Sequence, residues 1–183
     1  MLRSFVVLST LIGLSFSFPR DCGFPNGTDA RLAWWGGPGN ASVHLSNLST
    51  TDSTGNVEYP IRLTEPLLIK AHLSNNEANP WDGDGFTMSI KLWQYGGWSG
   101  CSWSDVPTFG LLDNRPACHN GVTCPLNLGE SDITITMDFT GFDSIISLLK
   151  DDSPYQIQFI LADKDSGHNF SVYAQARCHT TKT

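Results

Sequence analysis

Apolar and polar residues alternate along most of the chain. The segment 86–92 reads FTMSIKL, so every second side chain is apolar. Because successive side chains of a β-strand point to opposite faces, this period of two indicates strands that bury one face in a core. The same period appears in segments 57–63, 67–73, 133–139, 155–161 and 170–176, and in the shorter segment 30–34.

Turn-forming residues separate these segments, at 75–76, 82–85, 151–154 and 163–167. About seven strands at this spacing predict an all-β fold, a β-sandwich of two antiparallel sheets. Pro60 lies inside one of the alternating segments. Since proline donates no backbone hydrogen bond, that strand should lie at a sheet edge or carry a bulge.

Two segments depart from the alternation. In 142–149 the apolar residues follow the spacing i, i+3, i+4, i+7, which predicts either a short amphipathic helix or an apolar loop. The segment 94–121 carries six large apolar side chains among glycines and prolines. A long loop this rich in aromatic residues either serves a function or plugs one end of the sandwich.

The first residues are typical of a secretory signal peptide. Arg3 precedes the apolar run 5–16, and small residues at 15 and 17 suit cleavage after Ser17. We therefore expect a signal peptide at 1–17 and a single domain at 18–183. No second apolar stretch approaches ~20 residues, so we expect no membrane anchor.

Four glycosylation sequons agree with a secretory route. They begin at Asn26, Asn40, Asn47 and Asn169, and each has a residue other than proline in the middle. A glycan requires that its asparagine face solvent.

Composition and charge exclude two classes of protein. Hydrophobic residues make up 40% of the chain and charged residues only 16%, which is too apolar for a disordered protein. The net charge is −7 with no basic run, and phosphate binding along a nucleic acid needs clustered Lys and Arg. Nucleic acid is therefore not an expected partner.

Catalytic and metal-binding motifs are not apparent. The five histidines have no short metal-ligand spacing, and there is no Gly-x-Ser-x-Gly nucleophile motif. The segment 82–85 reads DGDG but lacks the further ligands of a calcium loop, so we expect a tight turn there. A thiolate pair of Cys101 and His119 is less favoured than structural roles for both residues. We therefore expect a protein that is not an enzyme and has no cofactor and no metal.

Three motifs resemble one known family. The segment 117–126 reads ACHNGVTCPL, with five residues between its cysteines. Segment 155–165, followed by Asn169 and Phe170, reads as a strand, an Asp-x-Asp turn and a further strand, and Asp-Cys-Gly at 21–23 follows the signal peptide. Together they resemble the ML (MD-2-related lipid-recognition) family, which includes a Niemann–Pick type C sterol carrier and a ganglioside activator protein.

The resemblance implies an immunoglobulin-like sandwich whose two sheets splay apart around a lipid tail. A face of aliphatic side chains suits such a cavity, but it also suits a packed core. The bound lipid would be a sterol, a phospholipid or a glycosphingolipid. The candidate lining residues are Leu67, Ile69, Met88, Ile90, Leu92, Ile133, Ile135, Ile157 and Phe159.

Loops at the rim of such a cavity should touch a membrane transiently, because indole rings and aliphatic side chains suit the headgroup boundary. A protein receptor and a lipid hydrolase are further candidate partners. The expected location is secreted, either the extracellular fluid or the lysosomal lumen. The candidate rim residues are Trp98, Trp103, Phe109, Leu111, Leu112, Phe142, Ile145, Ile146 and Leu149.

The resemblance also implies how the five cysteines pair. Cys118 and Cys124 should close a short loop. The early cysteine of the family bridges to the last strand, where Cys178 is the nearest candidate partner for Cys22. Gln94 stands where the family partner of Cys101 would be, so Cys101 is expected to be a free or intermolecular thiol.

A different class of protein fits part of the sequence. Trp34, Trp35 and Trp93 are suited to stacking on sugar rings. A secreted carbohydrate-binding or receptor-ligand module with a solid core is therefore the alternative function. A secreted hydrolase is less favoured, because no catalytic set is visible.

Overall fold

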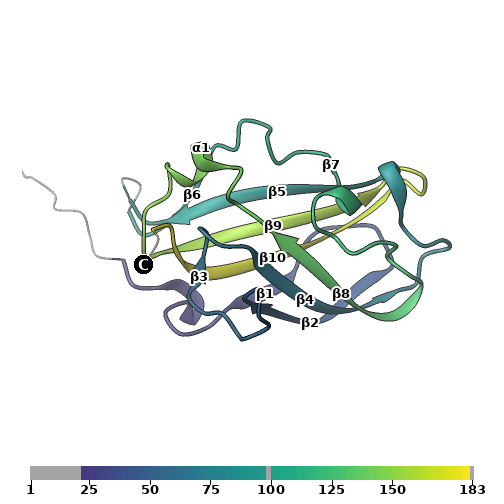
Figure 1. Ribbon diagram of the computed structural model, residues 1–183, viewed down its shortest axis with the longest axis horizontal. Helices are drawn as coiled ribbons and strands as arrows, with labels where there is room; N and C mark the ends of the chain where they lie inside the picture. The colour runs from purple at the N-terminus through teal and green to yellow at the C-terminus, as the bar shows by residue number, and fades with distance from the viewer. Residues whose placement is uncertain (1–21, 98–99, 182–183) are drawn as a thin grey trace, which may run out of the picture.

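Two β-sheets pack face to face and form a sandwich (Figure 1). The computed structural model describes residues 22–97 and 100–181. The expected signal peptide at 1–17 and Trp98 lie outside the described residues. Within the described ranges, no helix combines the length and the apolar character needed to cross a bilayer.

The larger sheet has the strand order β1-β10-β9-β5-β6, with β3 pairing with β10 and β7 pairing with β5. Its strands are β1 Ala33–Gly36, β3 Ile61–Arg62, β5 Phe86–Tyr95, β6 Trp103–Asp105, β7 Arg115–Pro116, β9 Ser153–Asp163 and β10 His168–His179. The smaller sheet has the order β2-β4-β8, formed by β2 Val43–Thr51, β4 Leu67–Asn75 and β8 Gly129–Met137. The strands pair antiparallel, and the short β3 is parallel to β10.

The described residues include four short helical turns, one before β1 and three between strands. They are η1 Pro25–Gly27, η2 Gly83–Gly85, η3 Ala117–His119 and α1 Asp143–Ile146. The turn at η2 is the one expected from the DGDG sequence, and the Asp82 carboxylate accepts a hydrogen bond from the Gly83 N–H at 2.8 Å. The apolar segment 142–149 does contain a helix, but α1 is only four residues long.

The core forms where the alternating apolar residues of the two sheets meet. On β4 the side chains of Leu67, Ile69, Ala71 and Leu73 are buried, as the period of two predicts. On β5 the buried residues Phe86, Met88 and Ile90 face inward in the same way. The predicted all-β sandwich of two antiparallel sheets is therefore confirmed.

Segment 57–63 forms less strand than its pattern predicted. Only Ile61–Arg62 pairs with β10, and Val57 is 82% exposed. Pro60 follows a cis peptide bond and donates no hydrogen bond, which is consistent with the predicted edge position. Ile61 and Leu63 still reach the core.

Strand β2 was not predicted, because a bulge interrupts its period of two. The pairing of β2 with β4 shifts register between Leu45 and Asn47. Val43 lies before the shift, and Leu48 and Thr50 lie after it, all three buried. One extra residue therefore moves the inward positions from odd to even numbers, and simple alternation misses the strand.

The long segment after β5 runs back along the edge of that strand. β6 pairs with the end of β5, and β7 pairs with its beginning. Between them, the Val106 N–H donates to the Leu92 carbonyl at 2.9 Å and the Ile90 N–H donates to the Leu112 carbonyl at 3.0 Å. The segment thus covers a strand edge that would otherwise expose unpaired backbone groups.

Two disulfides join parts of the chain, and one of them differs from the pairing that the family resemblance implied. Cys118 pairs with Cys124 as expected. Cys22 pairs with Cys101 rather than with Cys178, so the expectation of a free Cys101 was wrong. Cys178 is the free cysteine among the described residues. It occupies an inward position near the end of β10, so its thiol lies in the core, away from Cys22.

Candidate functional site

An opening with an apolar floor lies between strand β5 of the larger sheet and strand β8 of the smaller one. On the opposite side of the sandwich, β1 lies against β2. The opening is a pocket of about 320 Å³. Its apolar floor consists of Met88, Ile90, Leu112, Met137, Phe139 and Phe142, and its more polar margin consists of Arg115, His119, Asn120, Gly121, Thr136 and Asp138.

A turn after β8 places the aromatic part of this floor. The Asp138 carboxylate accepts hydrogen bonds from the Thr140 N–H at 2.9 Å and from the Thr140 hydroxyl at 2.7 Å. These bonds lower the pKa of Asp138 below its ordinary value. The turn carries Phe139 into the core just after the last residue of the strand.

The loop closed by Cys118 and Cys124 forms the margin on the β8 side. The Gly121 carbonyl accepts a hydrogen bond from the Thr136 N–H at 2.8 Å, so the loop packs on the β8 backbone. Gly121 has φ +95°, and a Cβ there would lie 1.9 Å from the Thr136 carbonyl oxygen. Only glycine fits this approach, and the disulfide holds the loop that carries His119 and Asn120 over the pocket.

Beyond the pocket lie small apolar cavities of about 20 to 30 Å³, two of them between the sheets and one between the larger sheet and α1. Each has roughly the volume of one water molecule, whereas known ligand pockets span about 300–1,000 Å³. The sheets are therefore closely packed in this conformation. Phe139 borders the large pocket and two of the small cavities, so it stands at their junction.

Each of the nine candidate lining residues borders one of these spaces. Met88 and Ile90 border the large pocket. Ile133 and Ile135 border a small cavity between the sheets, and Leu92 borders another beside α1. The remaining four, Leu67, Ile69, Ile157 and Phe159, line the cavity between β4 and β9.

Three of the candidate rim residues belong to the core instead of the surface. Leu112, Ile145 and Leu149 are buried, because α1 and the segment after β6 fold down over the cavity beside Ile90. Phe142 and Ile146 are partly buried against the same core. Trp103 is half-buried, with its ring 5.1 Å from the Tyr95 ring.

Three large apolar side chains do face solvent close to this opening. Phe109 is 72%, Leu111 43% and Leu148 50% exposed. Figure 1 shows α1 and the segment between β6 and β7 along the same side of the sandwich, above β5. Leu148 fitted the helical pattern but was not among the expected rim residues, because sequence spacing does not tell which side of so short a helix faces the core.

Cys178 and Tyr155 lie together at the inner end of these cavities. Burial raises the pKa of the Cys178 thiol to about 12, so it stays protonated and unreactive. Burial also raises the pKa of Tyr155, whose hydroxyl donates to the Lys150 carbonyl at 2.7 Å. Neither group is therefore poised as a nucleophile or a base.

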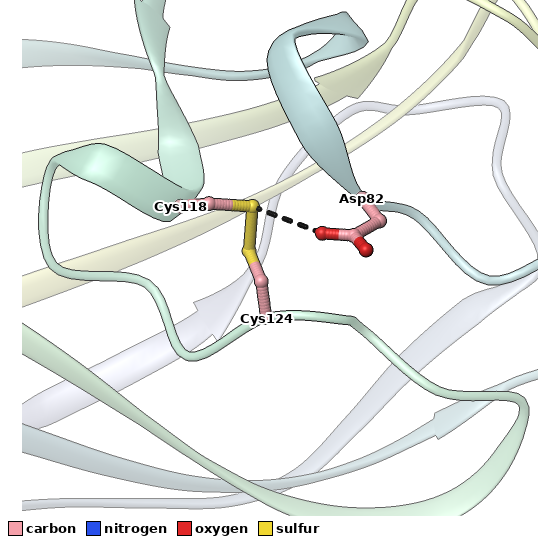
Figure 2. A group of neighbouring side chains, drawn as sticks. All are labelled: Asp82, Cys118 and Cys124. Carbon is pink, nitrogen blue, oxygen red and sulfur yellow. Dashed lines mark hydrogen bonds between the residues drawn. A yellow bond between two sulfur atoms is a disulfide. The ribbon is translucent and has the colours of Figure 1, made fainter.

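Asp82, Cys118 and Cys124 form a second cluster, which Figure 2 shows. Their potential ligand atoms lie within 4.8 Å of one another. The two sulfur atoms are bonded to each other, so neither is a thiolate that could bind a metal. The 3.5 Å approach of Asp82 Oδ1 to Cys118 Sγ is a contact with a sulfur that carries no hydrogen.

The tryptophans of the alternative function do not gather in one place. Trp35 stacks on Tyr173 with ring centroids 5.5 Å apart, and Trp93 lies 6.2 Å from the same tyrosine. Trp34, the neighbour of Trp35 along β1, packs instead against the core. Trp35 and Trp93 therefore share one aromatic cluster, which Trp34 does not join.

The four sequon asparagines lie at or near the surface. Asn26, Asn40 and Asn47 are exposed, and Asn169 is half-buried. Asn26 Nδ2 donates to Gln175 Oε1 at 2.6 Å, and Asn40 Oδ1 accepts from the Asn169 N–H at 2.8 Å. Glycosylation itself stays a prediction.

The two antiparallel sheets define the class of this protein, a β-sandwich. Neither a protein-family model nor the sequence of a curated protein matches the chain. A Niemann-Pick type C2 protein from the Japanese carpenter ant is similar in structure, with 11% sequence identity and a TM-score of 0.44 over 80% of this chain and 98% of that one. The C-terminal domain of wzt is also similar, with 8% identity and a TM-score of 0.37 over 86% and 82% of the two chains.

The disulfides indicate the compartment. Both bridges are formed within the described residues. Since thiols of cytosolic proteins are kept reduced, two structural disulfides indicate an oxidising compartment, extracellular or lumenal.

Proposed function

We propose that this protein is a secreted or lumenal lipid carrier, which holds an apolar lipid tail between its two sheets and has no catalytic step or cofactor. One observation carries the proposal: an apolar pocket of about 320 Å³ opens between β5 and β8 and adjoins the cavities between the sheets at Phe139. Each methylene transferred from water into such a space contributes roughly 0.8 kcal/mol. A long acyl chain therefore gains ample affinity from the lining alone.

A bound tail requires the sheets to move apart, because the present cavities are too small for it. The β5 and β8 edges are in different sheets and do not pair with one another. Separating them costs side-chain contacts and strains segment 115–123, which pairs with β5 through β7 and hydrogen-bonds to β8 through Gly121 and Thr123. The four-residue α1 and the loop beside it cover this side, so a small displacement of them widens the access.

The exposed side chains of Phe109, Leu111 and Leu148 support an exchange of lipid with membranes. They lie on the two segments that cover the opening. Side chains of this kind insert into the headgroup boundary of a bilayer. A tail would then pass from membrane to pocket without crossing water. A receptor or lipid hydrolase that accepts the loaded protein is a further part of this proposal.

Native mass spectrometry of the secreted protein tests the proposal. We expect a mass increment that organic extraction identifies as lipid, and uptake of a labelled lipid from vesicles by protein stripped of its ligand. A protein that carries no lipid and takes up none from vesicles of phospholipid, cholesterol or glycosphingolipid would contradict the function.

A sugar-binding module is the second candidate, favoured by the Trp35–Tyr173 stack. Trp35 is the more exposed member of the pair, and Trp93 adjoins it. Rings of this kind stack on the apolar faces of sugars. A glycan array with the wild type and Trp35→Ala separates the candidates, because the lipid carrier predicts no signal that depends on Trp35.

A further inference from the structure

We propose that the pocket between β5 and β8 recognises a zwitterionic phospholipid, with the lipid phosphate bound by Arg115. This inference rests on the proposed function and narrows the lipid from three classes to one. It depends on where the strand pairing places Arg115, on the partners of its guanidinium, and on the charge of the other residues at the pocket margin.

Strand pairing turns the Arg115 side chain toward the pocket. β7 pairs with β5, and Arg115 is the direct partner of Met88. Directly opposite residues of an antiparallel pair project from the same face of a sheet. Met88 is buried in the core, so Arg115 projects from the inner face at the margin of the same pocket, where both residues border the cavity.

Hydrogen bonds hold the Arg115 guanidinium in place and leave some of its N–H donors for a ligand. Arg115 Nε and Nη2 donate to Asn120 Oδ1 at 3.2 and 3.1 Å. Asn120 is itself fixed, because its Nδ2 donates to the Pro116 carbonyl at 2.7 Å. An arginine has five N–H donors, so the remaining ones are open to a ligand, and their planar geometry matches a phosphate.

Arg115 forms no ion pair with a carboxylate among the described residues, although the chain is acidic, with a net charge of −7. Arg177, by contrast, pairs with Asp152. A positive charge without a counter-ion at the margin of an apolar pocket favours an amphiphile that carries an anionic group there. A sterol hydroxyl offers only a weak partner for it, so the charge would gain little from a sterol.

The Asp138 carboxylate favours a zwitterionic headgroup over an anionic one. It borders the same pocket from the β8 side, and it is not ion-paired with Arg115. His119 is the third ionisable residue of the margin. A carboxylate there repels a headgroup with net negative charge and attracts the ammonium of phosphatidylcholine or phosphatidylethanolamine. The two opposite charges of the margin thus match the two charges of such a headgroup.

Extraction of labelled lipid from vesicles tests the inference. Vesicles contain phosphatidylcholine, phosphatidylglycerol, diacylglycerol or cholesterol as the labelled species. For the wild type we expect the highest uptake from phosphatidylcholine. Arg115→Gln should reduce that uptake about tenfold or more, because it removes a charge-assisted contact, and should leave diacylglycerol uptake unchanged. Asp138→Asn, which keeps the acceptor for Thr140, should raise uptake of phosphatidylglycerol.

Lys91→Gln is the matched control, because it removes the same charge from an exposed position on β5, next in sequence to the inward-facing Ile90. It should leave the uptake of every lipid unchanged. Equal uptake of phosphatidylcholine by the wild type and Arg115→Gln would overturn the inference, as would Asp138→Asn without effect on phosphatidylglycerol. If the wild type takes up diacylglycerol and phosphatidylcholine equally, the pocket does not recognise the headgroup and the inference is overturned. The proposed function as a lipid carrier is then unaffected. No uptake of any lipid overturns the carrier itself.

Discussion

Cys22 and Cys101 form a disulfide that spans 79 residues of sequence. The bridge ties the beginning of the described chain to the loop between β5 and β6. Gly96 packs beside it, since a Cβ at Gly96 would lie 3.7 Å from Cys22 Sγ. The segment that follows Cys101 runs along β5 to the pocket margin, so this bridge restrains one end of the segment that covers the site.

Removal of this bridge should cost more stability than removal of the other one. A disulfide lowers the entropy of the unfolded chain in proportion to the logarithm of the loop that it closes. For Cys22→Ser with Cys101→Ser we expect a loss of about 4 kcal/mol in the free energy of unfolding, and for Cys118→Ser with Cys124→Ser about 2 kcal/mol. Urea denaturation of both double variants measures the difference. Equal losses would show that strain or local contacts, rather than loop length, set the contribution.

Truncation of Phe139 should open the path between the pocket and the core. Phe139→Ala removes the ring at the junction of the cavities, so it should lower the free energy of unfolding by about 3–5 kcal/mol and speed lipid uptake from vesicles. Phe86→Ala is the control, because Phe86 is also buried but packs against Trp81 and lines none of the cavities described above. It should cost similar stability without faster uptake. Faster lipid uptake in both variants would show that a general loss of core packing, rather than removal of the Phe139 ring, speeds the uptake.

Polar substitutions at the exposed rim should weaken membrane contact without unfolding the protein. The triple variant Phe109→Ser, Leu111→Ser, Leu148→Ser should bind vesicles more weakly in a flotation assay and keep its stability within about 0.5 kcal/mol per site. Val57→Ser with Leu128→Ser changes two other exposed aliphatic side chains and serves as the control. Equal losses of vesicle binding in the two variants would argue against a specific rim.

The Asp151 carboxylate should add to the free energy of unfolding, and this addition should persist at moderately acidic pH. The carboxylate accepts hydrogen bonds from the Thr180 N–H at 2.7 Å and the Thr181 hydroxyl at 2.9 Å. The Thr180 N–H is the main cause that lowers the pKa of Asp151 from 3.8 to about 2. Because the folded-state pKa is depressed, the contribution is complete above pH 3.8 and disappears as the pH falls through about 2.

Asp151→Asn should therefore destabilise the protein at pH 6 and should lose its effect near pH 2. The side chain is 41% exposed, so the cost at pH 6 should stay below about 1 kcal/mol. Urea denaturation of the wild type and the variant at both pH values measures it. If the variant and the wild type differ in free energy of unfolding by the same amount at pH 6 and pH 2, the cause is the altered geometry of the side chain and not its charge.

Regular strands were predictable because burial follows a simple period. Segments 67–73, 86–92 and 155–161 each turn their apolar residues inward in the structure, as their sequences indicate. One extra residue in β2, between Leu45 and Asn47, shifts the period of its buried positions. The alternation of apolar residues therefore did not predict this strand. Segment 57–63 is the opposite case, in which alternation continues although Val57 forms only an isolated bridge with Thr51 and its side chain is exposed.

The candidate rim was only partly predictable for a different reason. Phe109 and Leu112 are both apolar residues of one irregular loop, yet the first faces solvent and the second is buried. The difference arises because the Leu112 carbonyl accepts a hydrogen bond from Ile90 and thereby fixes that end of the loop on β5. A contact of this kind joins segments far apart in sequence, and no local pattern records it.

The sequence by itself determined the all-β class and the inward faces of the regular strands, because both depend on side-chain chemistry at short spacing. The Cys118–Cys124 loop was expected from the family resemblance of the sequence, and the structure contains it. Only the tertiary structure decided that Cys22 meets Cys101, that the space between the sheets is divided into small cavities, and that Arg115 faces the pocket beside Met88. These features depend on the positions of segments that lie tens of residues apart. Their distances are set by the packing of the whole sandwich, which local periodicity does not encode.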